Sequence, residues 1–317
     1  MGIHILGTGS SLPTRIVDNH ELSTRLDTDN DWIVSRTGIR ERRIATTETL
    51  TDLSVDAARN AMEMAGLTAA DIDMVLCTTI NGDHITPSLA CMVAERLGIK
   101  APAMDLNAAC TGFIYALGTA EAFLSTGRFQ KILIISAEMM SRHLDWNDRA
   151  TCILFGDAAG AAIVEGGEAL DYIHLTGSEG NRFIEIKSHP GCSPFQQTLG
   201  EKTYLYLDGQ EVFRFAVSTV EKEVKRAMQE LECTPSDIDY FLLHQANKRI
   251  IESARVKLKQ PSEKFPTSVE RYGNISSASI PVLLDEMVRD HKIERGQKLF
   301  LCSFGAGLTA GSAVLTW

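Results

Sequence analysis

Three residues in this chain could together carry out acyl transfer: a cysteine, a histidine and an asparagine. Cys110 lies in "NAACTGF", His244 opens "HQANKRI", and Asn274 lies in "YGNISSASIP". A cysteine thiolate can attack an acyl carbonyl, an imidazole can handle a proton, and an amide can donate hydrogen bonds to a developing oxyanion. If the fold brings the three together, they form the set expected of an acyl-transfer site.

The residues around Cys110 predict a position between a strand and a helix. "PAMDLN" predicts the strand, and residues 111–127 have helical periodicity. A cysteine at a helix N-terminus faces unpaired amide N–H groups and the positive end of the helix dipole, which favour the thiolate. A buried structural thiol is the alternative, and it suits the cysteines in apolar, strand-like runs, Cys77, Cys152 and Cys302.

His244 and Asn274 also stand at expected element ends. His244 ends the strand-like run "YFLLH", so it should face the crevice where α/β proteins bind ligands. Asn274 follows Gly273 in a turn before a helix. Each residue also has an ordinary structural alternative. His244 could be a hydrogen-bonded histidine at the end of a strand, and Asn274 could serve only to stabilise a turn.

Four pairs of similar segments recur in the same order along the chain. They are 8–10 with 176–178, 61–73 with 227–239, 130–136 with 297–303, and 155–164 with 304–315. The first three pairs are 166 to 168 positions apart, and the fourth differs in spacing. Such a series predicts an internal duplication, with halves 1–166 and 167–317.

Short apolar strands alternate with helical segments in both halves, which predicts an α/β architecture with sheets covered on both faces. Two related halves would pack as layered sheets about a pseudo-dyad. Position 244 then corresponds to about position 78, and 274–277 to the segment around Cys110, so strand ends from both halves can converge on one crevice. Residues 187–212 predict an inserted loop and hairpin that can contact substrate.

Composition excludes several classes of protein. A chain of 317 residues with 44% hydrophobic content can build a large core, and a net charge of −10 argues against a general nucleic-acid binder. The start lacks a signal-peptide pattern, and no apolar run approaches the roughly 20 residues of a membrane span. Seven cysteines without a C-x-x-C pair or a metal-ligand cluster predict reduced thiols and no metal site, in a cytoplasmic protein.

Two further segments could serve a site. Residues 248–264 carry six basic and two acidic side chains, and three of the basic ones share a helical stripe, Lys248, Arg255 and Lys259. Beside His244 this stripe could dock an acidic partner or a phosphate, although a solvated face is its usual role. Residues 302–311, "CSFGAGLTAG", could present backbone amides to an oxyanion or form only a tight turn.

Together these motifs resemble the β-ketoacyl-(acyl-carrier-protein) synthase III family, the condensing enzymes that initiate type II fatty acid synthesis. The matching segments are "DWIVSRTGIRER" (31–42), "AACTGF" (108–113), "DRATCILFGDAAGAA" (148–162), "HQANKRI" (244–250), "YGNISSASIP" (272–281) and "FGAGLTAG" (304–311). The resemblance implies a thiolase-like duplicated α/β/α/β/α layered fold and a homodimer.

The resemblance also implies a mechanism. Cys110 would be acylated by an acyl-CoA primer, and His244 and Asn274 would promote decarboxylation of malonyl-acyl-carrier-protein and stabilise the enolate. The resulting carbanion would attack the acyl-Cys110 thioester, giving 3-oxoacyl-acyl-carrier-protein. Acyl-CoA and malonyl-acyl-carrier-protein are substrates in this scheme, and no cofactor or metal is implied.

By motif position, the resemblance assigns Trp32 and Arg149 to the CoA adenine, with Arg36 and Thr37 along the same tunnel. An acyl pocket near residues 84–92, completed by a partner subunit, is also implied.

Further residues follow from the same likeness. Phe304 would be an apolar gate beside the catalytic trio, and Ala306 would offer its amide to an oxyanion. Lys248 and Arg249 would dock the acidic carrier protein. The family commonly has glycine at 306 and tryptophan at 310, where this chain has Ala306 and Ala310. These differences bear on the geometry of the glycine-rich loop.

Three alternatives remain open at this point. The acyl-Cys110 chemistry could serve a specialised polyketide-type pathway with another acceptor. A Cys-His-Asn set also serves cysteine hydrolases, which would release free acid without condensation. A non-catalytic acyl-thioester-binding protein would form no acyl-enzyme at all.

Overall fold

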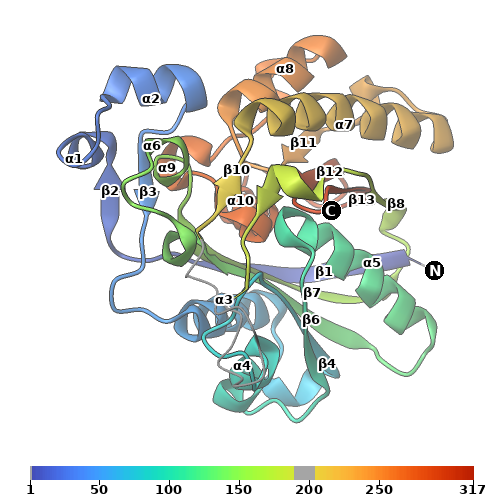
Figure 1. Ribbon diagram of the computed structural model, residues 1–317. Coiled ribbons are helices and arrows are strands. Elements are labelled where there is room, and N and C mark those ends of the chain that lie inside the picture. Colours follow the sequence, from blue (N-terminus) through green and yellow to red (C-terminus); the bar gives the residue numbers. More distant parts are fainter. Residues whose placement is uncertain (1, 189–203) are drawn as a thin grey trace.

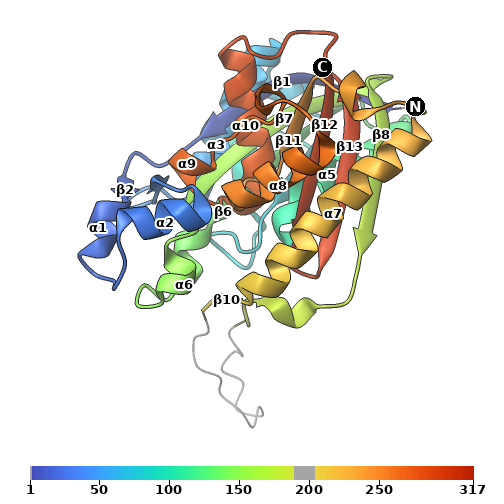
Figure 2. The same cartoon turned by 90° about the horizontal axis from the view of Figure 1, so that it is seen from above.

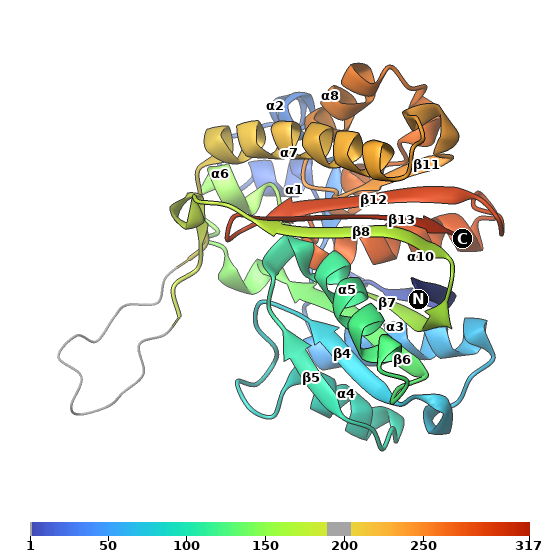
Figure 3. The same cartoon turned by 90° about the vertical axis from the view of Figure 1, so that its right-hand side faces the viewer.

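The computed structural model describes residues 2–188 and 204–317. The main elements stack in five layers, helix, sheet, helix, sheet and helix, which Figure 3 shows edge-on. No helix in these two ranges is long and apolar enough to cross a bilayer.

Strands from the first part of the chain form a mixed sheet in the order β1-β7-β6-β4-β5. They are β1 (Gly2–Ser11), β4 (Met74–Thr78), β5 (Ala103–Leu106), β6 (Lys131–Met139) and β7 (Asp157–Gly167). β4 is parallel to β5 and β6, whereas β7 is antiparallel to β1 and β6. The parallel neighbours bring the carboxyl ends of β4, β5 and β6 to one edge of the sheet, and Cys110 follows the last residue of β5 closely.

The second sheet has the order β11-β12-β13-β8. Its strands are β8 (Leu170–Gly177), β11 (Tyr240–Leu243), β12 (Lys298–Gly305) and β13 (Thr309–Thr316). β11 and β12 are parallel, and the other two neighbouring pairs are antiparallel. The apolar runs that indicate strands in the sequence all fall on strands of these two sheets.

Helices cover the outer face of each sheet (Figures 1 and 2). They are α3 (Leu50–Ala65) and α4 (Leu89–Leu97) on the first sheet and α7 (Gly209–Glu230) and α8 (Lys248–Leu258) on the second. A capping box of Thr49 and Asp52 begins α3, and Gly66, with φ of 67°, ends it. α3 and α7 each lie between strands of their half of the chain, as the alternation of strand-like and helical segments in the sequence predicts.

Two helices form the middle layer, α5 (Gly112–Ser125) and α10 (Ser279–Arg289). Their apolar side chains join those of both sheets in one buried cluster, which includes Phe113, Leu117 and Leu284. Each helix follows a 3₁₀ turn, Ala109–Thr111 before α5 and Ser276–Ala278 before α10. The segments that contain Cys110 and follow Asn274 thus begin the two central helices.

A smaller lobe packs beside the layers (Figure 1). It contains β2 (Ile16–Asp18), β3 (Glu41–Arg43), α1 (Asn19–Ser23), α2 (Asn30–Thr37), α6 (Arg149–Cys152) and α9 (Val269–Tyr272). Arg42 of β3 is fully buried and donates to the carbonyl oxygens of Val17 and Ile153 and to Asn19 Oδ1. These bonds tie β2 and α1 to the chain that follows α6.

The predicted insertion at 187–212 lies largely outside the described residues. Within its described part, β10 (Tyr206–Leu207) pairs antiparallel with β9 (Ile184–Glu185), which precedes the predicted insertion. The prediction of a hairpin up to residue 212 is wrong at its end, because α7 already begins at Gly209. Asp208 caps this helix by accepting hydrogen bonds from the amides of Gln210 and Glu211.

Candidate active site

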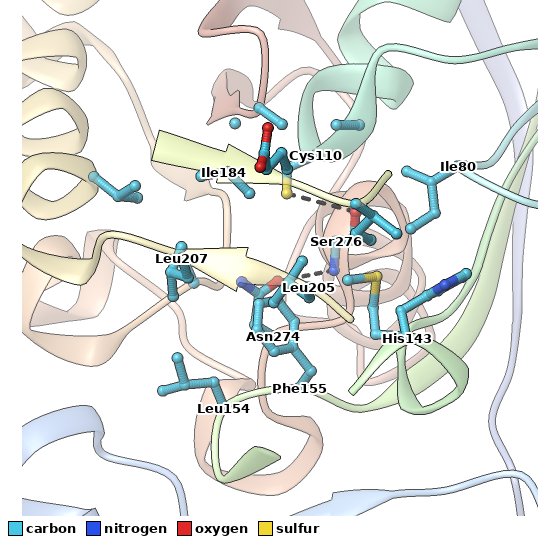
Figure 4. A pocket seen from close by; sticks show the side chains of 18 of the residues that line it. Ile80, Cys110, His143, Leu154, Phe155, Ile184, Leu205, Leu207, Asn274 and Ser276 are labelled. Atoms are coloured by element: carbon cyan, nitrogen blue, oxygen red, sulfur yellow. Dashed lines mark hydrogen bonds between the residues drawn. The ribbon is translucent and has the colours of Figure 1, made fainter. Parts of the chain in front are cut away.

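A cavity of about 830 Å³ opens between the two sheets and the smaller lobe. Of the site residues named from the sequence, it is lined by Cys110, His244, Asn274, Phe304 and Ala306, and Ile85 of the expected acyl-pocket segment 84–92 also lines it. Cys110 and Ile85 come from the first half of the chain and the other four from the second. Figure 4 shows Cys110, Ser276 and Asn274 on one wall, with apolar side chains such as Phe155 and Leu205 around them.

Cys110 lies in the 3₁₀ turn Ala109–Thr111 directly before α5. Ala109 has a φ of 45°, a left-handed conformation that costs a non-glycine residue roughly 1–3 kcal/mol. A Cβ on Gly112 would lie 2.8 Å from Thr78 Cβ, so glycine is needed for α5 to approach β4 this closely. The tight backbone thus holds the Cys110 side chain at the cavity wall, where it is partly exposed.

The environment of Cys110 favours the thiol, not the thiolate expected from its helix-start position. Burial raises the pKa of Cys110 to about 12. The hydroxyl of Ser276, 3.5 Å from Sγ, lowers this pKa, and the negative charge of Glu138 raises it. Because desolvation outweighs the hydrogen bond, Cys110 must lose a proton during the reaction.

Gly305, at the end of β12, packs against Cys110. A Cβ on Gly305 would lie 2.7 Å from Cys110 Cβ and 3.2 Å from its Sγ. The backbone of the glycine-rich loop therefore reaches the nucleophile only because residue 305 has no side chain.

Gly305→Ala should slow acylation of Cys110 by about 10²-fold, because the added methyl displaces Sγ from its attack geometry. Single-turnover acylation followed by mass spectrometry would measure this effect. Gly166→Ala is the matched control, since a Cβ there meets no atom within 4 Å. Equal rates for both variants would show that the close contact does not position the sulfur.

His244 follows β11 and is almost wholly buried. Its amide donates to Cys302 O at 2.8 Å, Nδ1 lies 2.7 Å from Ser279 Oγ, and its ring is edge-on to Phe304 at a centroid distance of 5.3 Å. Burial lowers the pKa of His244 to about 3. The imidazole is therefore neutral at physiological pH. A neutral imidazole still carries one N–H, which is enough to donate a hydrogen bond to an enolate.

The Ser279 hydroxyl determines which nitrogen of His244 carries the proton. Ser279 Oγ lies 2.7 Å from Nδ1 and 2.9 Å from Ser276 O, and its single proton can serve only one of them. Donation to Nδ1 leaves the N–H on Nε2, whereas donation to Ser276 O puts the N–H on Nδ1. Rotation of one hydroxyl thus couples the histidine tautomer to the turn that carries Ser276.

Asn274 is fixed by its backbone and by its side-chain oxygen. Its backbone N–H donates to Leu154 O at 2.8 Å, and its side-chain Oδ1 accepts from Ser276 N at 2.9 Å. Because the oxygen is used inside the turn, the side-chain NH₂ is the group left for the cavity.

The residues expected to bind CoA form a cluster that does not line the cavity itself. The guanidinium of Arg36 lies 4.7 Å and that of Arg149 5.0 Å from the centre of the Trp32 ring. Asn247, which lines the cavity, donates to Arg36 O at 3.1 Å and so joins this cluster to the start of α8. Thr37 is buried, and its hydroxyl donates to Ile33 O at 2.7 Å, so its side chain faces the interior of the lobe.

The basic stripe expected on α8 is largely paired with acids. Lys248 Nζ lies 2.6 Å from Glu270, and Arg255 Nη2 lies 2.5 Å from Glu252. Arg249 is exposed, and its guanidinium stacks over Phe213 of α7 at 5.5 Å. Glu270 lies outside residues 248–264, so a count of charges along that segment misses the partner of Lys248.

Sequence reasoning missed Glu138 and the serines beside Asn274. Glu138 is a fully buried carboxylate at the end of β6 that accepts hydrogen bonds from Ser276 and Ser277. A charged residue inside the apolar run "KILIISAEMM" was the available signal. In the described ranges, no group of three His, Cys, Asp or Glu side chains could hold a metal ion.

The chain is similar over its whole length to known proteins. The family model for 3-oxoacyl-[acyl-carrier-protein (ACP)] synthase III matches residues 104–178, and the model for its C-terminal part matches residues 228–317. A beta-ketoacyl-[acyl-carrier-protein] synthase III of Clostridium acetobutylicum is 43% identical over 320 residues, which cover 99% of this chain and 98% of the relative.

Two solved structures extend this likeness to the fold. The 3-oxoacyl-[acyl-carrier-protein] synthase III of Aquifex aeolicus VF5 has a TM-score of 0.93 at 35% identity and covers 100% of both chains. The priming beta-ketosynthase of the R1128 polyketide biosynthetic pathway has a TM-score of 0.92 at 34% identity and covers 99% of this chain and 96% of its own. The expected thiolase-like layered fold is confirmed, and the chain belongs to the β-ketoacyl-(acyl-carrier-protein) synthase III family.

Proposed function

We propose that this protein condenses an acyl-CoA primer with malonyl-acyl-carrier-protein, giving 3-oxoacyl-acyl-carrier-protein, CoA and carbon dioxide, and so initiates fatty acid synthesis. The observation that carries the proposal is the cavity shared by Cys110, His244 and Asn274. Family membership supports it, since the relatives bear the name of this condensing activity.

In the first half-reaction, Cys110 attacks the acyl-CoA thioester and CoA leaves. The Trp32 ring and the guanidinium groups of Arg36 and Arg149 offer a flat, cationic surface beside the cavity, suited to an adenine and its phosphates. The adenosine end would bind there while the acyl end reaches Cys110. Thr37 would contribute to this path only through its backbone.

In the second half-reaction, loss of carbon dioxide from the malonyl group generates an enolate that attacks the acyl-Cys110 carbon. His244 and the NH₂ of Asn274 would donate hydrogen bonds to the thioester oxygen on which negative charge develops. The apolar wall, including Phe304, strengthens these bonds by excluding water. Decarboxylation supplies the carbanion, so the scheme needs no metal or redox cofactor.

Docking of the carrier protein would use Arg249, which lies on the exposed surface at the start of α8, close to the cavity residues Ala246 and Asn247. Lys248 would contribute less, because Glu270 already pairs with it.

Arg249→Glu should raise the KM for malonyl-carrier by roughly 10-fold or more and leave the KM for acyl-CoA unchanged, because it reverses one charge at the carrier surface. Steady-state kinetics at two salt concentrations would show the effect, which should shrink as salt rises. Lys257→Glu on the same helix is the comparison, and an equal rise there would indicate a general field effect rather than a docking contact.

A homodimer in the cytoplasm is part of this proposal. Ile85 lines the cavity but is 99% exposed, and β5 is an edge strand of its sheet with Met104 exposed. A second copy that covers this edge would bury both side chains and close the acyl end of the cavity. Sedimentation velocity would test the assembly.

The decisive experiment is to incubate the protein with a panel of acyl-CoAs and map any adduct by peptide mass spectrometry, then to add malonyl-carrier. An adduct on Cys110 that is converted to 3-oxoacyl-carrier with release of carbon dioxide supports the proposal. Free acid without condensation would indicate a hydrolase, and no adduct with any donor would indicate an acyl-binding protein.

A specialised polyketide-type pathway is the second candidate. The observation behind it is the likeness to the R1128 priming ketosynthase, at a TM-score of 0.92 and 34% identity, which is lower than the 43% identity to the beta-ketoacyl-[acyl-carrier-protein] synthase III of Clostridium acetobutylicum. The same experiment separates them: the preferred primer and the carrier protein that accepts the product identify the pathway.

A further inference from the structure

Glu138 lies behind the candidate nucleophile, at the carboxyl end of β6. Its side chain is fully buried, and no ion pair to it occurs in the described part of the chain. Oε1 accepts hydrogen bonds from Ser277 Oγ at 2.7 Å and Ser276 Oγ at 3.1 Å, and Oε2 accepts from Ile80 N at 3.2 Å. Such an unpaired buried carboxyl needs a reason beyond packing.

One of these donors also touches the nucleophile. Ser276 Oγ lies 3.5 Å from Cys110 Sγ and 3.1 Å from Glu138 Oε1, and Figure 4 shows the contact with the sulfur. The serine has a single hydroxyl proton, which can go to only one neighbour. Ser276 Oγ is the donor in both hydrogen bonds; when its proton goes to Glu138 Oε1, Oγ can in turn accept from the S–H of Cys110.

The turn geometry aims Ser276 at both partners. Ser276 has a φ of 50°, a left-handed conformation uncommon for serine, and its amide is held by Asn274 Oδ1 at 2.9 Å. It stands 166 positions after Cys110, the displacement of the sequence repeats. The nucleophile and the serine thus occupy matching places before the two central helices.

Cys110 and Glu138, the two ionisable groups joined through the Ser276 hydroxyl, compete for one negative charge. Burial raises the pKa of Glu138 to about 7, although hydrogen bonds from Ser276, Ser277 and Ile80 lower it, and the charge of Glu138 raises the pKa of Cys110. In the described ranges Glu138 accepts its hydrogen bonds from hydroxyls and an amide, those of Ser276, Ser277 and Ile80, and Cys110 is the ionisable side chain that shares one of these donors. A proton that leaves the thiol is therefore best placed on this carboxylate.

His244 is a poor acceptor for that proton. Burial lowers its pKa to about 3, so a positively charged imidazole is strongly disfavoured in this site. The neutral ring is suited to donating a hydrogen bond to the enolate, which leaves the base for acylation to be found elsewhere.

We propose that Glu138, acting through the Ser276 hydroxyl, takes up the Cys110 proton during acylation and returns it when condensation frees the sulfur. The inference rests on the proposed function, and it assigns Glu138 and Ser276 as positioning residues for the transfer of the Cys110 proton. Glu138 holds the proton for the lifetime of the acyl-enzyme.

The steps balance. In acylation, the sulfur electron pair of Cys110 attacks the thioester carbon, its proton moves to Ser276 Oγ, and the serine proton moves to Glu138 Oε1. The carbon–sulfur bond to CoA breaks, and the CoA thiolate takes a proton from water. In condensation, the malonyl carbon–carboxylate bond breaks, the carbanion attacks the acyl carbon, and Cys110 leaves with the electron pair. Glu138 then returns its proton through Ser276, so the cycle consumes one solvent proton.

The test compares wild type with Glu138→Gln, Ser276→Ala and Ser277→Ala in single-turnover acylation by acetyl-CoA. Rates would be taken between about pH 5.5 and 9, where a general base shows its ionisation. Alkylation of Cys110 by iodoacetamide over the same range gives a readout that needs no substrate. Ser277→Ala is the matched variant, because Ser277 donates to the same oxygen of Glu138 but makes no contact with the sulfur that the structure records.

Wild-type rates should rise through a pH near 7, as Glu138 ionises to the form that can accept a proton. Glu138→Gln and Ser276→Ala should lose that rise in both assays and acylate about 10²-fold more slowly above it. Ser277→Ala should keep the rise but shift it to higher pH, because it removes a donor that lowers the pKa of Glu138.

Identical pH profiles for Glu138→Gln and wild type, or similar losses in Ser276→Ala and Ser277→Ala, would overturn the inference. The serine pair decides the question if Glu138→Gln fails to fold. A wild type that forms no acyl-enzyme would instead contradict the proposed function, and the iodoacetamide profiles would still test the proton route.

Discussion

Cys110→Ala should lose condensation by about 10⁴-fold or more while keeping the fold, because it removes the atom that carries the acyl group. Cys110 is partly exposed at a cavity wall, so the substitution leaves little new void in the core. Product formation from acyl-CoA and malonyl-carrier would measure the loss.

The same variant should still release carbon dioxide from malonyl-carrier. His244 and Asn274 do not depend on the sulfur for their own hydrogen bonds, which run to Ser279 and to Ser276. A Cys110→Ala protein that neither condenses nor decarboxylates would mean that the cysteine also shapes the enolate site.

Cys91 provides the control for unspecific chemistry. It is exposed on α4 and could react with an acyl-CoA without any catalysis. Cys91→Ala should acylate and condense like wild type. An adduct that remains in Cys110→Ala and disappears in Cys91→Ala would show that acylation alone is not evidence of a site.

The layered fold was within reach of the sequence because its signals are local and repeated. Strands such as "KILIIS" and "KLFLCS" are continuous apolar runs at a nearly constant displacement, and each became a central strand, β6 and β12. The insertion before α7 was harder to delimit, because Asp208 caps a helix whose first turn has no apolar pattern.

The contents of the cavity could be predicted, but their ionisation could not. Cys110 and His244 stand at element ends, and the sequence places both correctly at the crevice. The position of Cys110 at the start of a helix favoured a thiolate in the sequence analysis. In the structure, burial in the cavity wall and the negative charge of Glu138 raise the pKa of its thiol. Desolvation depends on what the rest of the fold packs around a residue, and no local pattern encodes it.

The ion pairs of the basic stripe could not be predicted from the sequence for the same reason. Lys248 and Glu270 are 22 positions apart and belong to different helices, yet their side chains meet at 2.6 Å. A stripe counted along one helix cannot include acids supplied by another. Within residues 2–188 and 204–317, Arg249 stacks on Phe213 and forms no ion pair with an acid.

His244→Ala and Asn274→Ala should each slow decarboxylation and condensation by about 10² to 10³-fold, while acylation of Cys110 survives largely unchanged in His244→Ala. Each variant removes a donor to the enolate oxygen and keeps the sulfur, but Asn274→Ala also removes the acceptor that holds the Ser276 amide, so its acylation should slow as well. Carbon dioxide release and acyl-enzyme formation, measured separately, would divide the two half-reactions. Asn81→Ala is the matched control, since Asn81 also lines the cavity but has no recorded hydrogen bond to a member of the trio in the described ranges.

The pH dependence of condensation adds an independent check on His244. Because burial lowers its pKa to about 3, decarboxylation should be flat through the usual histidine range near pH 6.5. A decline as pH falls through that range, present in wild type and absent in His244→Ala, would mean that the imidazole ionises during turnover. It would then act as a proton-transfer group, and the division of labour between His244 and Glu138 would have to be reversed.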